Sequence, residues 1–375
     1  MKPFFTFIAL LFTLHCAAQD SSRLRISLLT CSPGDELYSL FGHSAIRVVD
    51  SNSVTDHVYN YGTFNFDDKN FYLKFVQGKL LYFMSIEEFS DFRDLYQYTN
   101  RGMTEQVLNL SAEEKITLKQ FLVENLKEEN KYYKYDFFFD NCTTRVRDLI
   151  VKYKQPAPLL PAVRPQGMRF RQAIHEYLDR GKQPWSKLGI DILLGARTDR
   201  IMSASDQQFL PDNLMMALDS NRNGKLVASP QPVYTLEATT PAKNFFTPLI
   251  FFSSLLIVFL LLHFAAGKKW PLLMAGLDGM LFFLTGLLGV LLIFMWVGTD
   301  HSMTKNNYNL LWALPSHLII SFFITRKKPW VRKYFNFTFF AGAVVLVAWA
   351  FLPQQLNPAL VPFVLLIMFR AWVRK

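Results

Sequence analysis

Residues 135–150, Tyr-Asp-Phe-Phe-Phe-Asp-Asn-Cys-Thr-Thr-Arg-Val-Arg-Asp-Leu-Ile, place Cys142 where an aromatic run gives way to an amphipathic helix. Asp140 and Asn141 precede it, and both residue types are favoured helix caps, so we expect Cys142 in the first helical turn. Unpaired backbone N–H groups and the positive end of the helix dipole lower the pKa of a thiol there, and Arg145 lies close enough to help. The pattern predicts a sulfur nucleophile.

A thiolate nucleophile needs a base, and His43 is the candidate. It stands in Phe41-Gly-His-Ser-Ala-Ile-Arg-Val-Val49, at the head of an alternating, β-branched strand. The glycine before it favours close approach of a substrate or of the cysteine helix. A second strand follows through residues 58–61 after a polar turn, so the two strands are expected to form a hairpin. Further strands are expected at 71–83, from its aromatics, and at 107–110, and a capping box at Ser111 is expected to begin a helix.

The third member of such a site fixes the orientation and tautomer of the imidazole. The register of the second strand favours Asn60, whose side-chain carbonyl can accept the imidazole N–H. His57 is the alternative, but it is expected on the opposite face of the strand. The chain order is therefore a histidine strand, a strand with a polar residue, and then the cysteine helix. This is the order of a circularly permuted papain-like fold, in the α+β class.

The chain begins and ends with apolar segments. Residues 1–18 have the features of a secretory signal peptide. From residue 245 onward the chain is strongly apolar, in five blocks that approach or reach the length of a membrane-spanning helix. These blocks are 245–266, 271–297, 311–325, 334–352 and 359–373.

These features give the expected domain organisation. Residues 1–18 are the signal peptide, 19–165 a catalytic domain, 166–244 a helical extension and linker, and 245–375 a membrane domain of about five helices.

The net charge of +10 comes almost entirely from the apolar C-terminal region and reflects its membrane topology. Residues 245–375 hold 11 Lys and Arg against 2 Asp and Glu, whereas residues 19–244 are neutral. If the first span enters from the exported side, ten of those cations lie in cytoplasmic segments and only Lys305 lies opposite. This distribution follows the positive-inside rule and gives no basic surface for nucleic acid. Asp278, inside the second block, is expected either to be paired or to reach water.

Further motifs carry a resemblance to a known family. They are Thr30-Cys-Ser-Pro-Gly34, residues 41–48, Tyr59-Asn-Tyr-Gly62 and Asp140-Asn-Cys-Thr-Thr144, followed by the multi-span tail. Together they resemble the Lnb family of bacterial lipoprotein N-acyltransferases over nearly the whole mature chain. In more distant relatives, the lecithin:retinol and phospholipid acyltransferases, a comparable histidine strand and Asn-Cys helix take an acyl chain from a phospholipid.

The resemblance implies an activity and two lipid partners. Cys142 matches the family's nucleophile and His43 its base. The expected reaction moves an acyl chain from a membrane phospholipid, through a cysteine thioester, to the α-amino group of a diacylated lipoprotein. The protein is then expected in the bacterial inner membrane, multi-pass, with its N-terminal domain in the periplasm. No cofactor and no metal site is expected.

Four further residues are candidates for substrate binding. Tyr61 and Arg145 flank the expected site in sequence, and Asp300 and His301 lie in the loop between the second and third apolar blocks, on the exported side. Such a loop can hold a lipid headgroup or the substrate backbone, and the simpler interpretation is a solvated loop.

Two other functions remain open from the sequence. One is a membrane-tethered cysteine amidase or peptidase that acts on cell-wall peptides. The other is a non-catalytic lipid- or lipoprotein-binding module in which Cys31 and Cys142, the cysteines outside the signal segment, form a disulfide.

Overall fold

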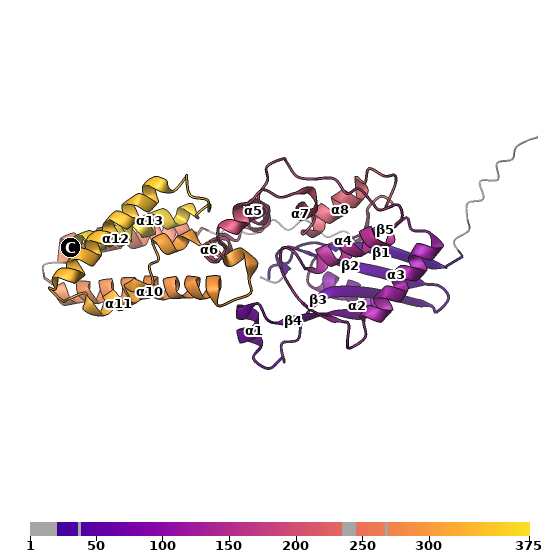
Figure 1. Ribbon diagram of the computed structural model, residues 1–375, viewed down its shortest axis with the longest axis horizontal. Coiled ribbons are helices and arrows are strands. Elements are labelled where there is room, and N and C mark those ends of the chain that lie inside the picture. Colours follow the sequence, from indigo (N-terminus) through magenta and orange to yellow (C-terminus); the bar gives the residue numbers. More distant parts are fainter. Residues whose placement is uncertain (1–20, 37–38, 235–244, 267–268) are drawn as a thin grey trace, which may run out of the picture.

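The computed structural model describes residues 21–36, 39–234, 245–266 and 269–375. The predicted signal peptide, residues 1–18, lies outside the described residues. The molecule is elongated, with a mixed α/β domain at one end and a helical region at the other (Figure 1). Helices α5 (Phe170–Arg180) and α6 (Pro184–Leu193) lie between these two parts (Figure 1).

The α/β domain is built on an antiparallel sheet in the order β6-β4-β3-β2-β1-β5-β7. Its strands are β1 (Leu24–Cys31), β2 (His43–Asp50), β3 (Thr55–Thr63), β4 (Leu81–Glu88), β5 (Met103–Val107), β6 (Tyr132–Lys134) and β7 (Gln231–Tyr234). The hairpin predicted around His43 is β2–β3, with Val48 paired to His57. Since β2 begins at His43, this residue lies at the end of the sheet remote from the hairpin turn.

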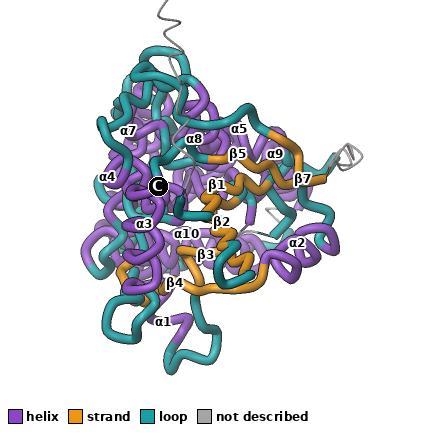
Figure 2. Tube along the Cα trace, turned by 90° about the vertical axis from the view of Figure 1, so that its right-hand side faces the viewer, coloured by secondary structure: helices purple, strands orange, loops and turns teal. Residues whose placement is uncertain are grey.

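Helices cover both faces of this sheet. On one face, α3 (Ala112–Asn125), α4 (Cys142–Tyr153) and α8 (Pro211–Asp219) pack against Ile26, Leu28 and Ile46. On the other, α2 (Phe89–Tyr98) packs against Leu29, Ala45 and Val58. Figure 2 shows the strands between α3 and α4 on one side and α2 on the other. The Ser111 capping box predicted to begin a helix is present at α3.

Two strand predictions differ from the structure. Residues 71–83, whose aromatics suggested a strand, form helix α1 (Phe71–Gln77) and then enter β4. Asn70 and Gly78 flank α1 in the left-handed conformation, and these turns end the extended chain. The strand expected at 107–110 ends instead at Val107, because Asn109 turns away to bond Leu226.

The segment after residue 165 belongs to both parts of the molecule. It forms α5 (Phe170–Arg180), α6 (Pro184–Leu193), the 3₁₀ helix η2 (Ala196–Asp199), α7 (Ala204–Gln207), α8 and β7. Leu214 and Leu218 of α8 lie in the core of the sheet domain, whereas Leu188 of α6 packs among the membrane helices. The predicted helical extension therefore packs into the cores of both parts.

The C-terminal region contains three helices long and apolar enough to cross a membrane, among the described residues. These are α9 (Pro248–Ala266), α10 (Pro271–Val297) and α12 (Pro329–Ala348). The other two expected spans are shorter. The third block is broken into the 3₁₀ helix η4 (Tyr308–Leu311), α11 (Ser316–Ile320) and the 3₁₀ helix η5 (Ser321–Phe323), and the last forms α13 (Val361–Arg374). A count of five spans is not established.

Asp278 of α10 is paired within the membrane region. Its carboxylate accepts hydrogen bonds from Arg370 Nε and Nη2 at 2.5 and 2.9 Å and from Arg374 Nε at 2.6 Å. Both Asp278 and Arg370 are almost completely buried. Of the two possibilities the sequence left for Asp278, the structure shows pairing.

A buried polar junction joins α5 and α6 to the loops of the membrane region. The Arg171 guanidinium bonds the Asp191 and Asp199 carboxylates, at 2.8 Å and 3.0 Å. Asn357 donates to the second oxygen of Asp191 at 2.9 Å. Gly195 N donates to Met303 O at 2.9 Å. A charged group this buried is held only where its partners are fixed, so the junction sets the α/β domain on the membrane region.

Candidate active site

The start of α4 holds Cys142 as expected from its caps. Asn141 is the N-cap: its side chain accepts from Thr144 N at 2.8 Å, and the Thr144 hydroxyl accepts from Asn141 N at 2.8 Å. Asn141 also donates to the carbonyls of Phe137 and Phe209. These bonds fix the first helical residue, Cys142, whose side chain is only partly buried. Cys142 is thus rigidly placed and not fully enclosed by the protein.

His43 lies beside this thiol. The Cys142 side chain and the His43 imidazole form a hydrogen bond, and the backbone N–H of Ser44 donates to the same sulfur. The Thr143 hydroxyl lies 3.8 Å from the sulfur and 3.1 Å from the Ser44 hydroxyl. The start of β2 and the start of α4 therefore meet at Cys142.

Asn60 orients the imidazole, and Glu87 orients Asn60. His43 Nε2 lies 2.9 Å from Asn60 Oδ1, and Asn60 Nδ2 donates to Glu87 Oε1 at 2.7 Å. The amide nitrogen thus faces Glu87 and the amide oxygen faces His43. This is the orientation that an ionised carboxylate requires, because it only accepts hydrogen bonds. His43 Nε2 is then the protonated nitrogen, and Nδ1 is left for the Cys142 sulfur.

Glu87 is a residue that the sequence analysis missed. It stands on β4, paired with Val58 of β3, and so lies on the face that carries Asn60. Its sequence neighbour Glu88 points to the other face and lies 2.9 Å from His57 Nε2. His57, the alternative to Asn60, is thus paired away from Cys142. Only the strand register distinguishes the two glutamates, and the sequence alone does not supply it.

The pKa values of the pair move in opposite directions. Burial raises the pKa of the Cys142 thiol, but the charge and hydrogen bond of His43 outweigh burial and bring this pKa down to about 7. Burial lowers the pKa of His43, but the Cys142 thiolate and the Asn60 bond raise it above its ordinary value. Such shifts favour a thiolate–imidazolium pair near neutral pH.

Gly62 and Tyr135 lie beside Cys142. Gly62 lies in an irregular stretch of β3 with φ +91°, and a Cβ there would lie 3.6 Å from both Cys142 Cβ and Tyr135 Cε2. The glycine expected to allow close approach, Gly42, instead faces the Cys31 carbonyl, 2.6 Å from where its Cβ would stand. The sequence reasoning assigned this role to the wrong glycine of the two.

Cys31 and Cys142 are both free thiols in the described part of the chain. Cys31 is fully buried on β1, and burial raises the pKa of its thiol to about 12 while Tyr96 shares a hydrogen bond with it. Its protonated, inaccessible sulfur contrasts with that of Cys142. The Cys31–Cys142 disulfide expected of a non-catalytic lipid- or lipoprotein-binding module is not formed in this structure.

Two of the four substrate-binding candidates have structural partners instead. Tyr61 is buried in the core and donates to Asn125 Oδ1 at 2.5 Å. Arg145 forms a two-bond pair with Asp140, at 2.6 and 2.8 Å, and its guanidinium lies 3.4 Å from the centre of the Tyr133 ring. The structure does not bring Tyr61 into the site. Through Asp140, Arg145 stabilises the loop that precedes Cys142. The pKa of the Cys142 thiol is lowered by His43.

Asp300 and His301 contact the sheet domain close to the site. Asp300 pairs with Lys134 of β6, and its backbone N–H donates to Gln77 O at 2.9 Å. His301 Nε2 lies 3.2 and 3.1 Å from the carbonyls of Phe75 and Val76. The loop is therefore a contact between the two parts of the molecule and is not simply solvated.

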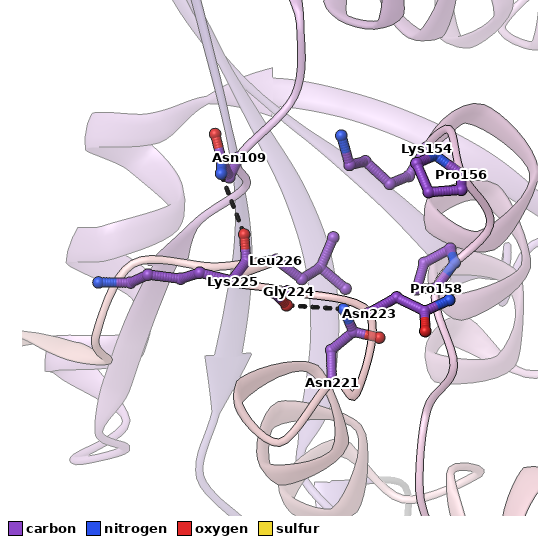
Figure 3. Close-up of a pocket in the computed structure, with 9 residues that line it drawn as sticks. All are labelled: Asn109, Lys154, Pro156, Pro158, Asn221, Asn223, Gly224, Lys225 and Leu226. Atoms are coloured by element: carbon purple, nitrogen blue, oxygen red, sulfur yellow. Dashed lines mark hydrogen bonds between the residues drawn. The ribbon is translucent and has the colours of Figure 1, made fainter.

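A surface pocket of about 240 Å³ lies elsewhere, between residues 154–158 and the turn at 221–226. Figure 3 shows that its asparagines turn toward neighbouring backbone carbonyls: Asn109 donates to Lys225 O and Asn221 to Gly224 O. Its polar groups hold loops together, and it contains none of the residues around Cys142.

Comparison with protein families matches both parts of the chain. Residues 15–167 match the Lnb N-terminal periplasmic domain, and residues 240–374 match the Lnb transmembrane domain. No curated protein and no solved structure matches the chain. The protein is thus a membrane protein with a periplasmic N-terminal part, and the chain belongs to the Lnb family.

Proposed function

We propose that the protein is a lipoprotein N-acyltransferase with Cys142 as nucleophile. The observation that carries the proposal is the free thiol at the first position of α4, bonded to an imidazole whose tautomer is fixed by Asn60 and Glu87. The order of histidine strand, asparagine strand and cysteine helix supports a circularly permuted papain-like fold for the sheet domain.

In the first step the Cys142 thiolate attacks an ester carbonyl of a membrane phospholipid. The N–H of the first helical residue has no partner within the helix, so it is available to bind the oxyanion together with a neighbouring donor. When the tetrahedral intermediate collapses, the ester C–O bond breaks and the His43 imidazolium gives its proton to the leaving lysophospholipid. The acyl chain stays on Cys142 as a thioester.

In the second step the free α-amino group of a diacylated lipoprotein attacks the thioester. His43, now neutral, takes the proton that the nitrogen loses, and the thiolate of Cys142 leaves. An amide bond forms and the lipoprotein becomes triacylated. The same imidazole therefore acts as acid in the first step and as base in the second.

The attachment to the membrane supports lipid substrates. The loop after α10 contacts the sheet domain through Asp300 and His301, and α6 packs among the membrane helices. This holds the thiol near the periplasmic side of the bilayer, where both lipid substrates are accessible. We propose the bacterial inner membrane as that bilayer, with several spans.

The test uses mass spectrometry of lipoprotein N-termini from a host that lacks its own N-acyltransferase. Wild type is expected to add one acyl chain, whereas Cys142→Ser and His43→Ala are not. A matched control is Cys31→Ser, which removes the buried thiol and keeps the nucleophile. Unchanged lipoprotein together with shortened cell-wall peptides would support an amidase instead.

A further inference from the structure

An exposed apolar surface lies on α1 and the turn before it. The side chains of this α1 surface, with their exposed fractions, are Phe66 (64%), Tyr72 (78%), Leu73 (56%), Phe75 (49%) and Val76 (39%). Phe71 alone turns inward, where it contacts Phe64 and Phe66. So much exposed aromatic and aliphatic surface on two turns of helix is unfavourable in water and indicates contact with an apolar partner.

The position of α1 identifies that partner. The carbonyls at its C-terminal end bond the loop that immediately follows α10, through His301 and the Asp300 N–H. A Cβ at Gly78 would lie 3.2 Å from His301 N, so the end of α1 and the loop after α10 are in direct contact. Figure 1 shows α1 beneath the junction, next to the end of α10, and Figure 2 shows it projecting beyond the sheet. It therefore lies at the level where a membrane-spanning helix leaves the bilayer.

The start of α9 has a similar surface at its domain-facing end. Trp185 donates from its indole to Phe246 O at 2.8 Å and contacts the rings of Phe246 and Phe251. Phe246 is 56% exposed. Trp and Tyr gather at membrane–water interfaces because their rings are apolar and carry a polar N–H or O–H group, as Trp185 and Tyr72 do here. Two separate elements thus bear such rings on the periplasmic side of the membrane region.

A row of rings leads from α1 toward the nucleophile. Phe71 contacts Phe64 (centroids 5.8 Å apart), Phe64 contacts Tyr82 (5.3 Å), and Tyr82 stacks on Tyr135 (4.3 Å). Tyr135 in turn lies beside Cys142, because a Cβ at Gly62 would lie 3.6 Å from both residues. The rings therefore form an unbroken row of contacts from α1 to the neighbour of Cys142.

We propose that residues 64–78 form an interfacial element that inserts the α1 surface into the periplasmic leaflet of the surrounding membrane. The exposed rings lie among the upper acyl chains, and the exposed Lys69 extends toward the headgroups. Lys74 is paired with Asp68. Lipid then reaches the aromatic row directly from the leaflet. This last step rests on the proposed function, whereas the insertion itself does not.

The test measures lipid contact on the full chain, reconstituted in vesicles of phosphatidylethanolamine and phosphatidylglycerol. In a Cys142→Ala background, Leu73→Cys carries an environment-sensitive fluorophore, and a share of the lipids carries a nitroxide near the carbonyl end of the acyl chain. Val54→Cys is the matched control, because Val54 is apolar and 89% exposed but lies at the β2–β3 turn, remote from the membrane region. The unsubstituted background reports any labelling of Cys31.

The expected result is a blue-shifted emission at residue 73 with quenching several times that at residue 54. Equal quenching at both positions overturns the proposal. So does a label at residue 73 that is shielded from aqueous iodide but not quenched by the lipid nitroxide, since this indicates a protein partner. Tyr72→Cys repeats the measurement if Leu73→Cys folds poorly. No turnover is required, so the outcome is independent of acyl transfer.

Discussion

Asn60 Nδ2 donates to Glu87 Oε1 at 2.7 Å, and this bond determines which nitrogen of His43 faces Cys142. The amide of an unsupported asparagine can turn over and present its NH₂ group to the imidazole. His43 would then need its Nε2 unprotonated, and its proton would lie on Nδ1, toward the sulfur. Glu87 lies on the face of the sheet opposite α4 and prevents this rotation, because its carboxylate holds the NH₂ group of Asn60.

Glu87→Leu is therefore expected to lower acyl transfer by roughly 10- to 100-fold, the range observed when a partner that orients a histidine is removed. Glu87→Gln keeps an acceptor for the Asn60 amide and is expected to restore most of the activity. The measurement is the rate of lipoprotein acylation across pH for wild type and both variants. A merely structural role predicts equal losses for both substitutions, with no change in the pH profile.

The reactivity of Cys142 toward a small alkylating reagent is expected to follow its lowered pKa. The thiolate reacts, so the rate rises with pH and reaches half its maximum near pH 7, where the pKa of Cys142 lies. In His43→Ala the two largest effects that lower this pKa are lost, and only the Ser44 and Thr143 hydrogen bonds still oppose burial, so the midpoint should move to higher pH. The measurement is the alkylation rate of the full chain, followed by mass spectrometry of the peptide that contains Cys142.

Cys31 serves as the internal control for that titration. It is fully buried and the pKa of its thiol is about 12, so it is expected to remain unmodified over the same pH range. An unshifted Cys142 midpoint in His43→Ala would show that His43 does not ionise the thiol. Alkylation of Cys31 at the same rate as Cys142 would show that the sheet domain had opened.

The sequence predicted the residues of the site better than their surroundings. Caps and the position of Cys142 follow from local rules, and the alternating pattern after His43 places a strand there, so α4 and β2 were predictable. Glu87 was not, because its role depends on which face of β4 meets Asn60, and that requires the register between strands far apart in sequence. The α1 helix was missed since its aromatics are common in strands, while the left-handed turns at Asn70 and Gly78 that end the extended chain leave a weak sequence signal.

The pairing of Asp278 with Arg370 predicts a non-additive effect on stability. Asp278→Leu leaves Arg370 buried without its partner and is expected to destabilise the folded state by about 3–5 kcal/mol. Asp278→Leu combined with Arg370→Met removes the fully buried pair, leaves only the partly exposed Arg374 without its partner, and should recover much of that loss. Thermal unfolding of the purified protein in detergent measures both. If the double variant is as unstable as the sum of the single ones, the two residues are not coupled.

Gly195 offers a way to loosen the junction without touching the site. A Cβ at this position would lie 2.0 Å from Lys305 O, a backbone atom that cannot rotate away, so Gly195→Ala must push the segment after α6 off the membrane loop. We expect a loss of roughly 1–3 kcal/mol in stability, as for other overpacked contacts. Acyl transfer from membrane phospholipid should fall, because the junction sets the distance from Cys142 to the lipid. Alkylation of Cys142 should keep its rate and its midpoint, since His43 and Asn60 are untouched.

Gly189→Ala is the matched control for this variant, because nothing lies within 4 Å of a Cβ there and the residue is inside helix α6. Alanine in a helix interior is more favourable than glycine by up to about 1 kcal/mol, so this variant should be as stable as wild type or more so. Normal acyl transfer in a destabilised Gly195→Ala protein would contradict the role of the junction. Loss of both transfer and alkylation would mean that the clash reaches the active site, and the two parts of the molecule would then be more tightly coupled than the contacts at Gly195 imply.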